Sequence, residues 1–147
     1  MNISSSAFED GQFIPSKYTC DGNNINPPLV ISDVSERARS LVLIATDPDA
    51  PGGDWVHWIV WNIPVNTTEI FEGSIPDKAS EGTTSFGTVG YGGPCPPSGA
   101  HNYMFKLYAI GSDLYLDSNA RMDDLVDAMD EYIVETAELV GKYKRKK

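Results

Sequence analysis

Three segments of the chain carry hydrophobic patterns that predict strands at the centre of a sheet. Residues 39–46 are almost wholly apolar, as expected of a strand that is covered on both faces. Residues 55–63 hold three tryptophans within seven positions and therefore need a large packing surface. Residues 101–111 alternate between the two faces of a strand. The alternation gives one face to His101, Tyr103, Phe105, Leu107 and Ala109.

The remaining patterns predict shorter strands and a helix at the periphery. Four further segments resemble strands: residues 29–31, 70–72, 83–86 and 138–143. Apolar residues at helical spacing predict a helix over about 121–134, with its apolar stripe facing the core. Residues 1–28 are expected to be irregular, with at most short strands. The predicted fold is therefore mostly β.

The length suits one domain, residues 1–147, with a core large enough to need no metal or disulfide support. The formal net charge is −10. Five of the eleven basic residues lie within positions 142–147, so the chain before residue 142 carries a net charge of −15. This charge argues against nucleic acid as a partner, because phosphate backbones bind basic surfaces. Residues 142–147 are expected to form a basic solubilising tail, with contact to acidic surfaces as the alternative.

The sequence also bears on location and on the state of the cysteines. No apolar run approaches the roughly 18–20 residues that cross a bilayer, and residues 1–6 lack the features of a signal peptide. A cytoplasmic location is therefore expected. Cys20 and Cys95 do not make a zinc motif, because neither belongs to a Cys-x-x-Cys pair. The sequence does not decide whether they lie close enough to bond, although a reduced pair is favoured in a cytosolic protein.

The candidate functional residues lie where the predicted central strands meet loops that are rich in proline. Asp47 ends the apolar face that begins with Leu41, and Pro48 stops the strand directly after it. His57 lies in the tryptophan-rich strand, where strict alternation places it on the same face as Ile59 and Trp61. Local alternatives exist for both residues. The aspartate is equally typical of a turn, and a single histidine in such a strand is more often a hydrogen-bonded core residue.

The second histidine follows a glycine- and proline-rich loop over residues 87–99, which the prolines make rigid. His101 and Tyr103 then point the same way from the start of their strand. A carboxylate favours the charged form of a nearby imidazole, and imidazolium, phenol and loop N–H groups all donate hydrogen bonds. We therefore predict one small, preformed anion pocket that contains Asp47 and both imidazoles. Its affinity is expected to be modest, because the long-range field of the acidic chain is unfavourable.

These residues form two motifs that resemble a known family. The first runs from Asp47 to Pro51 and continues with His57-Trp58, and the second runs from Gly92 to Pro97 and leads to His101-Asn102-Tyr103. With supporting segments elsewhere, residues 18–143 resemble the phosphatidylethanolamine-binding proteins (PEBP), also called Raf kinase inhibitor proteins, and especially their short bacterial and archaeal members. The resemblance implies a mostly β fold: a large central mixed or antiparallel sheet, a smaller second sheet and a few peripheral helices.

The resemblance also implies a pocket at one end of the molecule for phosphate- or carboxylate-type anions, including the head group of phosphatidylethanolamine. By motif position, the pocket residues are Asp47, Ala50, Pro51, His57, Cys95, Pro96, His101 and Tyr103. The chain departs from the family pattern at Asn102, where the family usually has arginine, and this removes a fixed positive charge. It also lacks the C-terminal helix of the animal members, so their kinase-inhibitory role transfers poorly.

The leading prediction is a non-enzymatic binding or regulatory protein without a cofactor. Inhibition of a protein kinase or a serine protease is implied by the family resemblance alone. The alternative is a metal-dependent enzyme, in which Asp47, His57 and His101 supply a two-histidine, one-carboxylate centre. A nucleophilic Ser98 is disfavoured, because the chain has no Gly-x-Ser-x-Gly elbow. A third alternative is a self-associating scaffold, a homodimer formed through Phe71 or Phe86.

Overall fold

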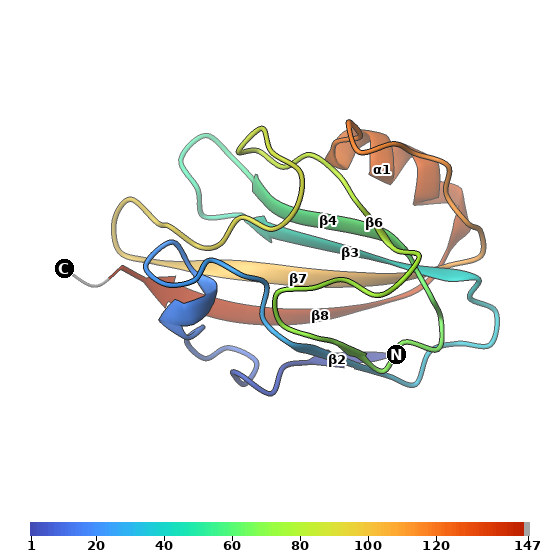
Figure 1. Ribbon diagram of the computed structural model, residues 1–147, viewed down its shortest axis with the longest axis horizontal. Coiled ribbons are helices and arrows are strands. Elements are labelled where there is room, and N and C mark those ends of the chain that lie inside the picture. Colours follow the sequence, from blue (N-terminus) through green and yellow to red (C-terminus); the bar gives the residue numbers. More distant parts are fainter. Residues whose placement is uncertain (146–147) are drawn as a thin grey trace.

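The computed structural model describes residues 1–145, and within them the chain forms a five-stranded and a three-stranded sheet (Figure 1). The order of the large sheet is β6 (Ser80–Glu81), β4 (Trp55–Ile63), β3 (Ser40–Asp47), β7 (Ala100–Ile110) and β8 (Ile133–Lys144). The order of the small sheet is β1 (Asn2–Ser4), β2 (Leu29–Ser32) and β5 (Glu69–Ile70). Neighbouring strands are antiparallel in both sheets. The predicted mostly β architecture with a smaller second sheet is confirmed.

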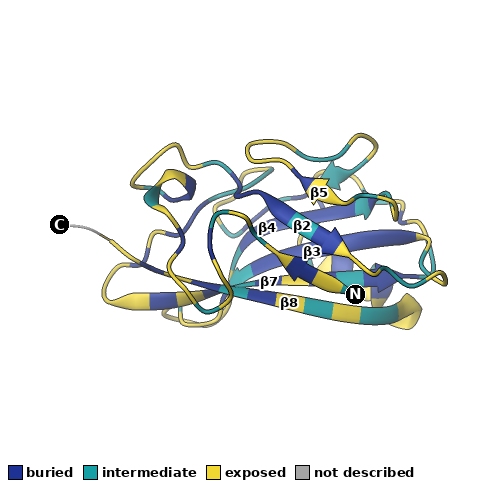
Figure 2. Cartoon of the chain, turned by 90° about the horizontal axis from the view of Figure 1, so that it is seen from below, coloured by how far each residue is buried: buried dark blue, intermediate teal, exposed yellow. Residues whose placement is uncertain are grey.

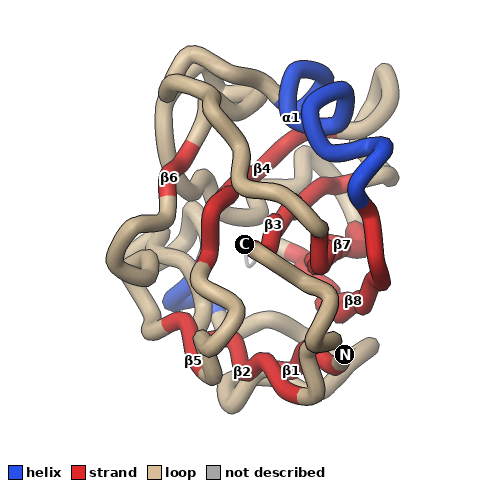
Figure 3. The backbone as a smooth tube through the Cα atoms, turned by 90° about the vertical axis from the view of Figure 1, so that its right-hand side faces the viewer, coloured by secondary structure: helices blue, strands red, loops and turns tan. Residues whose placement is uncertain are grey.

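The elements stack in three layers, which are visible end-on in Figure 3. The small sheet covers one face of the large sheet, and α1 (Met122–Met129) covers the other. Side chains that alternate along β3 point into the core on each side of the large sheet. Leu41 and Leu43 pack in the core between the sheets, while Val42 and Ile44 pack in the core beneath the helix. Because both faces are covered, the strand is apolar along its length. Figure 2 shows that it is buried over most of that length.

The three central strands lie within one residue of their predicted bounds, whereas several peripheral predictions were wrong. Residues 83–86 are not a strand, and Thr83 makes only an isolated bridge with Val89. The helix ends at Met129, and a 3₁₀ turn, η2 (Asp130–Tyr132), follows it. β8 begins at Ile133, five residues earlier than predicted, because it pairs with β7 along nearly the full length of that strand. A second 3₁₀ turn, η1 (Ser16–Tyr18), lies in the N-terminal segment that was predicted to be irregular.

The C-terminal basic residues are partly ordered in the sheet. Lys142 and Lys144 belong to β8, and the guanidinium of Arg145 forms an ion pair with Asp21 at 3.0 Å. The predicted tail therefore starts inside the last strand, and Lys146 and Lys147 lie outside the described residues. None of the helices within residues 1–145 is long and apolar enough to span a membrane.

β-Bulges in β4 set the directions of its side chains. Ala45 lies opposite Trp58 and Thr46 lies opposite Val56, so His57 is an extra residue without a partner on β3. The bulge turns His57 to the face of the sheet that carries Asp47, while Ile59 and Trp61 pack beneath the helix. The face predicted for His57 by strict alternation was therefore wrong. A sequence pattern cannot show the extra residue, because a bulge is defined by its pairing with the neighbouring strand.

A second irregularity in β4 lies at Asn62, which has a φ of 53°. Its side chain accepts a hydrogen bond from the Leu114 N–H and donates one to the Leu114 carbonyl, both at 2.8 Å. These bonds fix the loop that follows β7 to the end of β4. Asparagine suits this position because it tolerates the left-handed conformation better than most residues with a side chain.

We expect Asn62→Ala to lower the free energy of unfolding by about 2–3 kcal/mol, because it loses both hydrogen bonds and places a Cβ-bearing residue at positive φ without a polar side chain. Asn62→Gly keeps the backbone conformation accessible and should lose about 1–2 kcal/mol. Urea unfolding followed by tryptophan fluorescence measures both. Asn66→Ala, at an exposed position, is the matched control and should change the value by less than about 0.5 kcal/mol. Equal stabilities for all three variants would contradict this account of the bulge.

Candidate functional site

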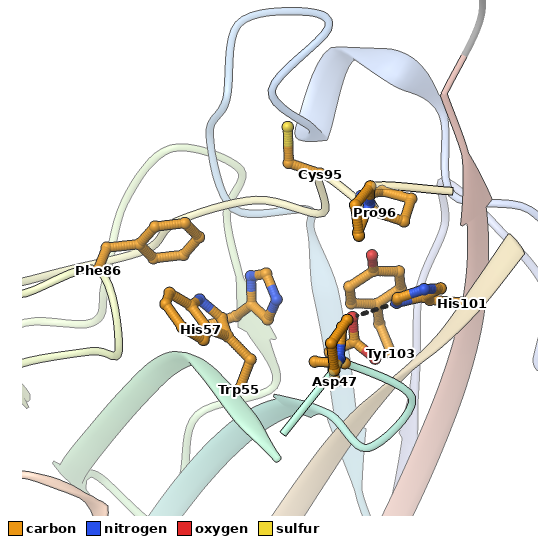
Figure 4. A pocket seen from close by; sticks show the side chains of 11 residues that line it. Asp47, Trp55, His57, Phe86, Cys95, Pro96, His101 and Tyr103 are labelled. Carbon is orange, nitrogen blue, oxygen red and sulfur yellow. Dashed lines mark hydrogen bonds and ion pairs between the residues drawn. The ribbon is translucent and has the colours of Figure 1, made fainter. Parts of the chain in front are cut away.

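A pocket lies at the end of the large sheet where β3 ends and where β4 and β7 begin (Figure 4). Its volume is about 290 Å³. The residues that line it are Asp47, Ala50, Pro51, Trp55, His57, Phe86, Cys95, Pro96, Pro97, His101 and Tyr103. All eight residues predicted from the sequence are in this set, so the structure brings together two motifs that are about forty residues apart in the chain.

Asp47 and His101 form a buried pair at the base of the pocket. The His101 Nδ1 donates to the Asp47 Oδ2 at 2.7 Å. The other oxygen of Asp47 accepts the backbone N–H of Asp49 at 2.8 Å. Asp49 in turn accepts hydrogen bonds from the backbone and the side chain of Asn102. This chain of bonds ties the end of β3 to the start of β7, and it uses Asn102 to hold the loop at the exposed edge of the pocket.

His57 is held in a single orientation by the loop on the opposite side of the pocket. Its Nδ1 lies 2.6 Å from the carbonyl oxygen of Gly92. Because a carbonyl oxygen only accepts, Nδ1 carries the proton and Nε2 is the nitrogen left for a ligand. Burial lowers the pKa of His57 below its ordinary value of 6.5, although the Gly92 carbonyl and the Asp47 charge oppose the shift. The ring is therefore mainly neutral at pH 7.

Tyr103 supplies a hydroxyl without a partner at the base of the pocket. The residue is 2% exposed, and its hydroxyl makes no hydrogen bond with any described residue. Burial raises the pKa of this phenol, and the nearby Asp47 carboxylate raises it further, while the backbone of Cys95 acts in the opposite direction. Both groups lie near the hydroxyl, but neither meets the geometry of a hydrogen bond to it. The hydroxyl is therefore protonated at neutral pH. A buried donor of this kind is rare in proteins unless water or a ligand satisfies it.

Two aromatic side chains form the outer wall of the pocket. Trp55 is 39% exposed and Phe86 is 44% exposed, and their ring centroids lie 5.4 Å apart in an edge-to-face arrangement. The ring of Phe86 also contacts His57 edge-to-face at 5.3 Å. Sequence reasoning missed Trp55 and Pro97, and it considered Phe86 only as a dimer contact. The one available signal was the position of Trp55, directly after the loop that Asp47 begins.

Cys20 and Cys95 form a disulfide, with their Cα atoms 5.5 Å apart. The expectation of a reduced pair is therefore wrong for this structure. The two loops meet through backbone packing as well as through sulfur. The Cys20 N–H donates to the Pro94 carbonyl at 3.1 Å, and Gly93 lies so close to residues 18–19 that a Cβ there would be 2.5 Å from the Tyr18 carbonyl oxygen. A contact between residues 75 positions apart in the sequence has no local signature.

The metal-centre alternative finds no support in this geometry. Within residues 1–145, no group of three or more His, Cys, Asp or Glu side chains is arranged to hold a metal ion. Both oxygens of Asp47 accept hydrogen bonds, one from His101 and one from the backbone of Asp49.

The stacked sheets and the end pocket are the features of a known class of β protein. The family model for the phosphatidylethanolamine-binding protein matches residues 4–144, so the chain belongs to this family. The UPF0098 protein of Methanothermobacter thermautotrophicus is 46% identical over 150 residues, covering 99% of each chain. The UPF0098 protein of Chlamydia trachomatis is 42% identical, again over 99% of each chain.

Solved structures show the same fold. The phosphatidylethanolamine-binding protein homologue CT736 of Chlamydia trachomatis matches with a TM-score of 0.94 at 41% identity, covering 99% of this chain and 97% of that one. YbcL of Escherichia coli, described as a new member of the mammalian PEBP family, matches with a TM-score of 0.92 at 31% identity, covering 99% and 98%. The family assignment made from the two sequence motifs is confirmed.

The buried His57 should make stability depend on pH. Because folding lowers its pKa, the unfolded chain binds more protons than the folded chain just below pH 6.5. The free energy of unfolding therefore takes no penalty from His57 above pH 6.5, and it decreases as the pH falls below 6.5 toward the lower pKa of the folded state. We expect His57→Asn, whose amide can still donate to the Gly92 carbonyl, to lose less unfolding free energy than the wild type between about pH 7.5 and about pH 5.

Urea titrations at a series of pH values measure this difference. The wild type and His57→Asn share every other titratable group, so subtracting one curve from the other isolates the histidine. Parallel curves would show that His57 titrates in the folded protein as it does in the unfolded chain.

Proposed function

We propose that this chain is a non-enzymatic binding protein whose pocket holds a small phosphate- or carboxylate-type anion, free or as the head group of a phospholipid. The observation that carries the proposal is the hydroxyl of Tyr103, a buried donor without a protein partner at the base of the pocket. A ligand oxygen at this point would satisfy it. Family membership supports ligand binding in general.

The two imidazoles support the same ligand chemistry. Each ring has its Nδ1 bound to a protein acceptor, the Gly92 carbonyl for His57 and the Asp47 carboxylate for His101. Each ring therefore has only Nε2 left for a ligand, and protonation turns that nitrogen from an acceptor into a charged donor. An oxyanion beside the neutral ring of His57 favours its protonation, so binding takes up a proton there and is stronger at lower pH.

The carboxylate in the pocket does not oppose an anion as strongly as its charge suggests. Both oxygens of Asp47 accept hydrogen bonds from the protein, and one of the donors is the imidazole of His101. No Lys or Arg is found among the described residues that line the pocket. With the overall charge of −10, this points to a dissociation constant on the order of millimolar for a simple anion.

The apolar wall adds a second element of recognition. A volume of about 290 Å³ is several times the roughly 30 Å³ that one water molecule occupies in the liquid. The pocket therefore has room for more than a single phosphate group. Apolar contact to the organic part of such a ligand, to which the anionic group is attached, is available from Pro51, Trp55 and Phe86. The pocket therefore suits an anionic group on a short organic substituent better than a free inorganic ion.

A catalytic role has no equivalent support. Ser98 lies on the exposed part of the loop outside the pocket lining, and no other serine or threonine is found among the described residues that line the pocket. Regulation of a protein kinase or a serine protease is an extension of the binding role that rests on family resemblance alone. The cytoplasmic location and the homodimer stay predictions.

We expect Tyr103→Phe to weaken the binding of phosphorylethanolamine at least about tenfold, because a hydrogen bond to a charged group contributes roughly 1.5–3 kcal/mol. Titration followed by the NMR signals of the two histidine rings measures the affinity. Tyr108→Phe is the matched control, since Tyr108 is on the same strand but packs beneath the helix. If neither imidazole signal moves at about 10 mM phosphorylethanolamine, the pocket does not bind such anions and the proposal fails.

A further inference from the structure

The disulfide joins a wall of the pocket to a part of the molecule outside it. Cys95 is exposed and lines the pocket, whereas Cys20 does not line it. Figure 4 shows Cys95 and Pro96 on the side of the pocket toward which the Tyr103 hydroxyl points. The bond therefore acts on the ligand site through Cys95.

Cys20 is held firmly by the turn that follows η1. The Thr19 hydroxyl donates to the Ser16 carbonyl and accepts the N–H of Asp21, and the N–H of Gly22 donates to the Thr19 carbonyl. The turn is tight, since a Cβ at Gly22 would lie 2.3 Å from the Ser16 carbonyl oxygen. Cys20 is therefore a fixed anchor whether or not it is bonded to its partner.

The opposite loop is held by hydrogen bonds up to Pro94, and beyond Cys95 it is held by the burial of Pro96. The N–H and carbonyl of Gly92 both bond to His57, the N–H of Gly93 donates to Asn24, and the Pro94 carbonyl accepts from Cys20. From residue 96 to residue 99, by contrast, no hydrogen bond is made to any residue within 1–145. Among residues 1–145, the disulfide is thus the last covalent or hydrogen-bonded attachment of the loop before β7 begins at Ala100.

We propose that the Cys20–Cys95 disulfide is a redox latch on the pocket, which holds Cys95 and Pro96 in place over Tyr103 when bonded and releases them when reduced. The proposal rests on the proposed function, because the latch acts on ligand binding. Opening requires a thiol reductant: two thiols give up two electrons and two protons, the Cys20–Cys95 bond breaks to two thiols, and the reductant becomes a disulfide. Thiols of this class keep cytosolic cysteines reduced.

The latch couples ligand and redox state in both directions. A released loop must be ordered again before it can close over a ligand, so the reduced protein binds more weakly. Linkage then requires that a bound ligand favour the disulfide by the same factor. The rigid prolines at positions 96 and 97 make this arm move as a stiff unit and not as a flexible chain.

The test compares phosphorylethanolamine binding by the oxidised wild type, the wild type reduced with dithiothreitol, and Cys20→Ser. The serine variant breaks the bond without altering any residue that lines the pocket. We expect both unbonded forms to bind about tenfold more weakly than the oxidised wild type, with a lower NMR order parameter for the backbone N–H of Ser98 and unchanged order parameters in β3. Dithiothreitol should have no further effect on Cys20→Ser, which controls for action of the reductant elsewhere.

The reciprocal measurement is the fraction of disulfide at a fixed ratio of reduced to oxidised dithiothreitol, with and without saturating phosphorylethanolamine. The latch predicts that the ligand raises the ratio of bonded to reduced protein about tenfold. Equal affinities for the bonded and reduced forms, or a disulfide fraction that ignores the ligand, would overturn the latch and leave the proposed function standing. Failure of the oxidised wild type to bind would overturn the proposed function and the latch together.

Discussion

The site depends on the antiparallel pairing of β3 with both of its neighbours. In an antiparallel pair, the end of one strand lies beside the start of the next, so the last residues of β3 meet the first residues of β4 and β7. Asp47 lies opposite Trp55, and Thr46 lies opposite Met104, one residue from Tyr103. The same hydrogen bonds that build the apolar centre of the sheet thus gather an acid, two imidazoles and a phenol at its rim.

The buried polar groups at this rim differ in whether they have a hydrogen-bond partner in the protein. Asp47, His57 and His101 each have a protein partner, which offsets much of the cost of removing them from water. Tyr103 has none among the described residues. A protein selected for stability alone would be expected to satisfy or remove that hydroxyl, so the unsatisfied donor is better explained as a binding feature.

The loops around the pocket differ in how they are fixed, and this difference links the architecture to function. The loop after β3 is held by Asp49 through its bonds to Asn102, and the first half of the proline loop is held by His57 and Asn24. The second half depends on its prolines and on sulfur. The pocket therefore has a base held by hydrogen bonds and one wall that is fastened covalently.

The sequence by itself determined the three central strands, the division of β7 into two faces and the two motifs, because these follow from local alternation and from loop residues adjacent in the chain. Through the family resemblance, the two motifs also named eight residues that the structure places in the pocket. The tertiary structure alone decided the direction of His57, the disulfide and the role of Phe86. A bulge exists only relative to a neighbouring strand, and the other two require loops from distant parts of the chain to meet. Such contacts are set by tertiary packing, about which a local sequence pattern carries no information.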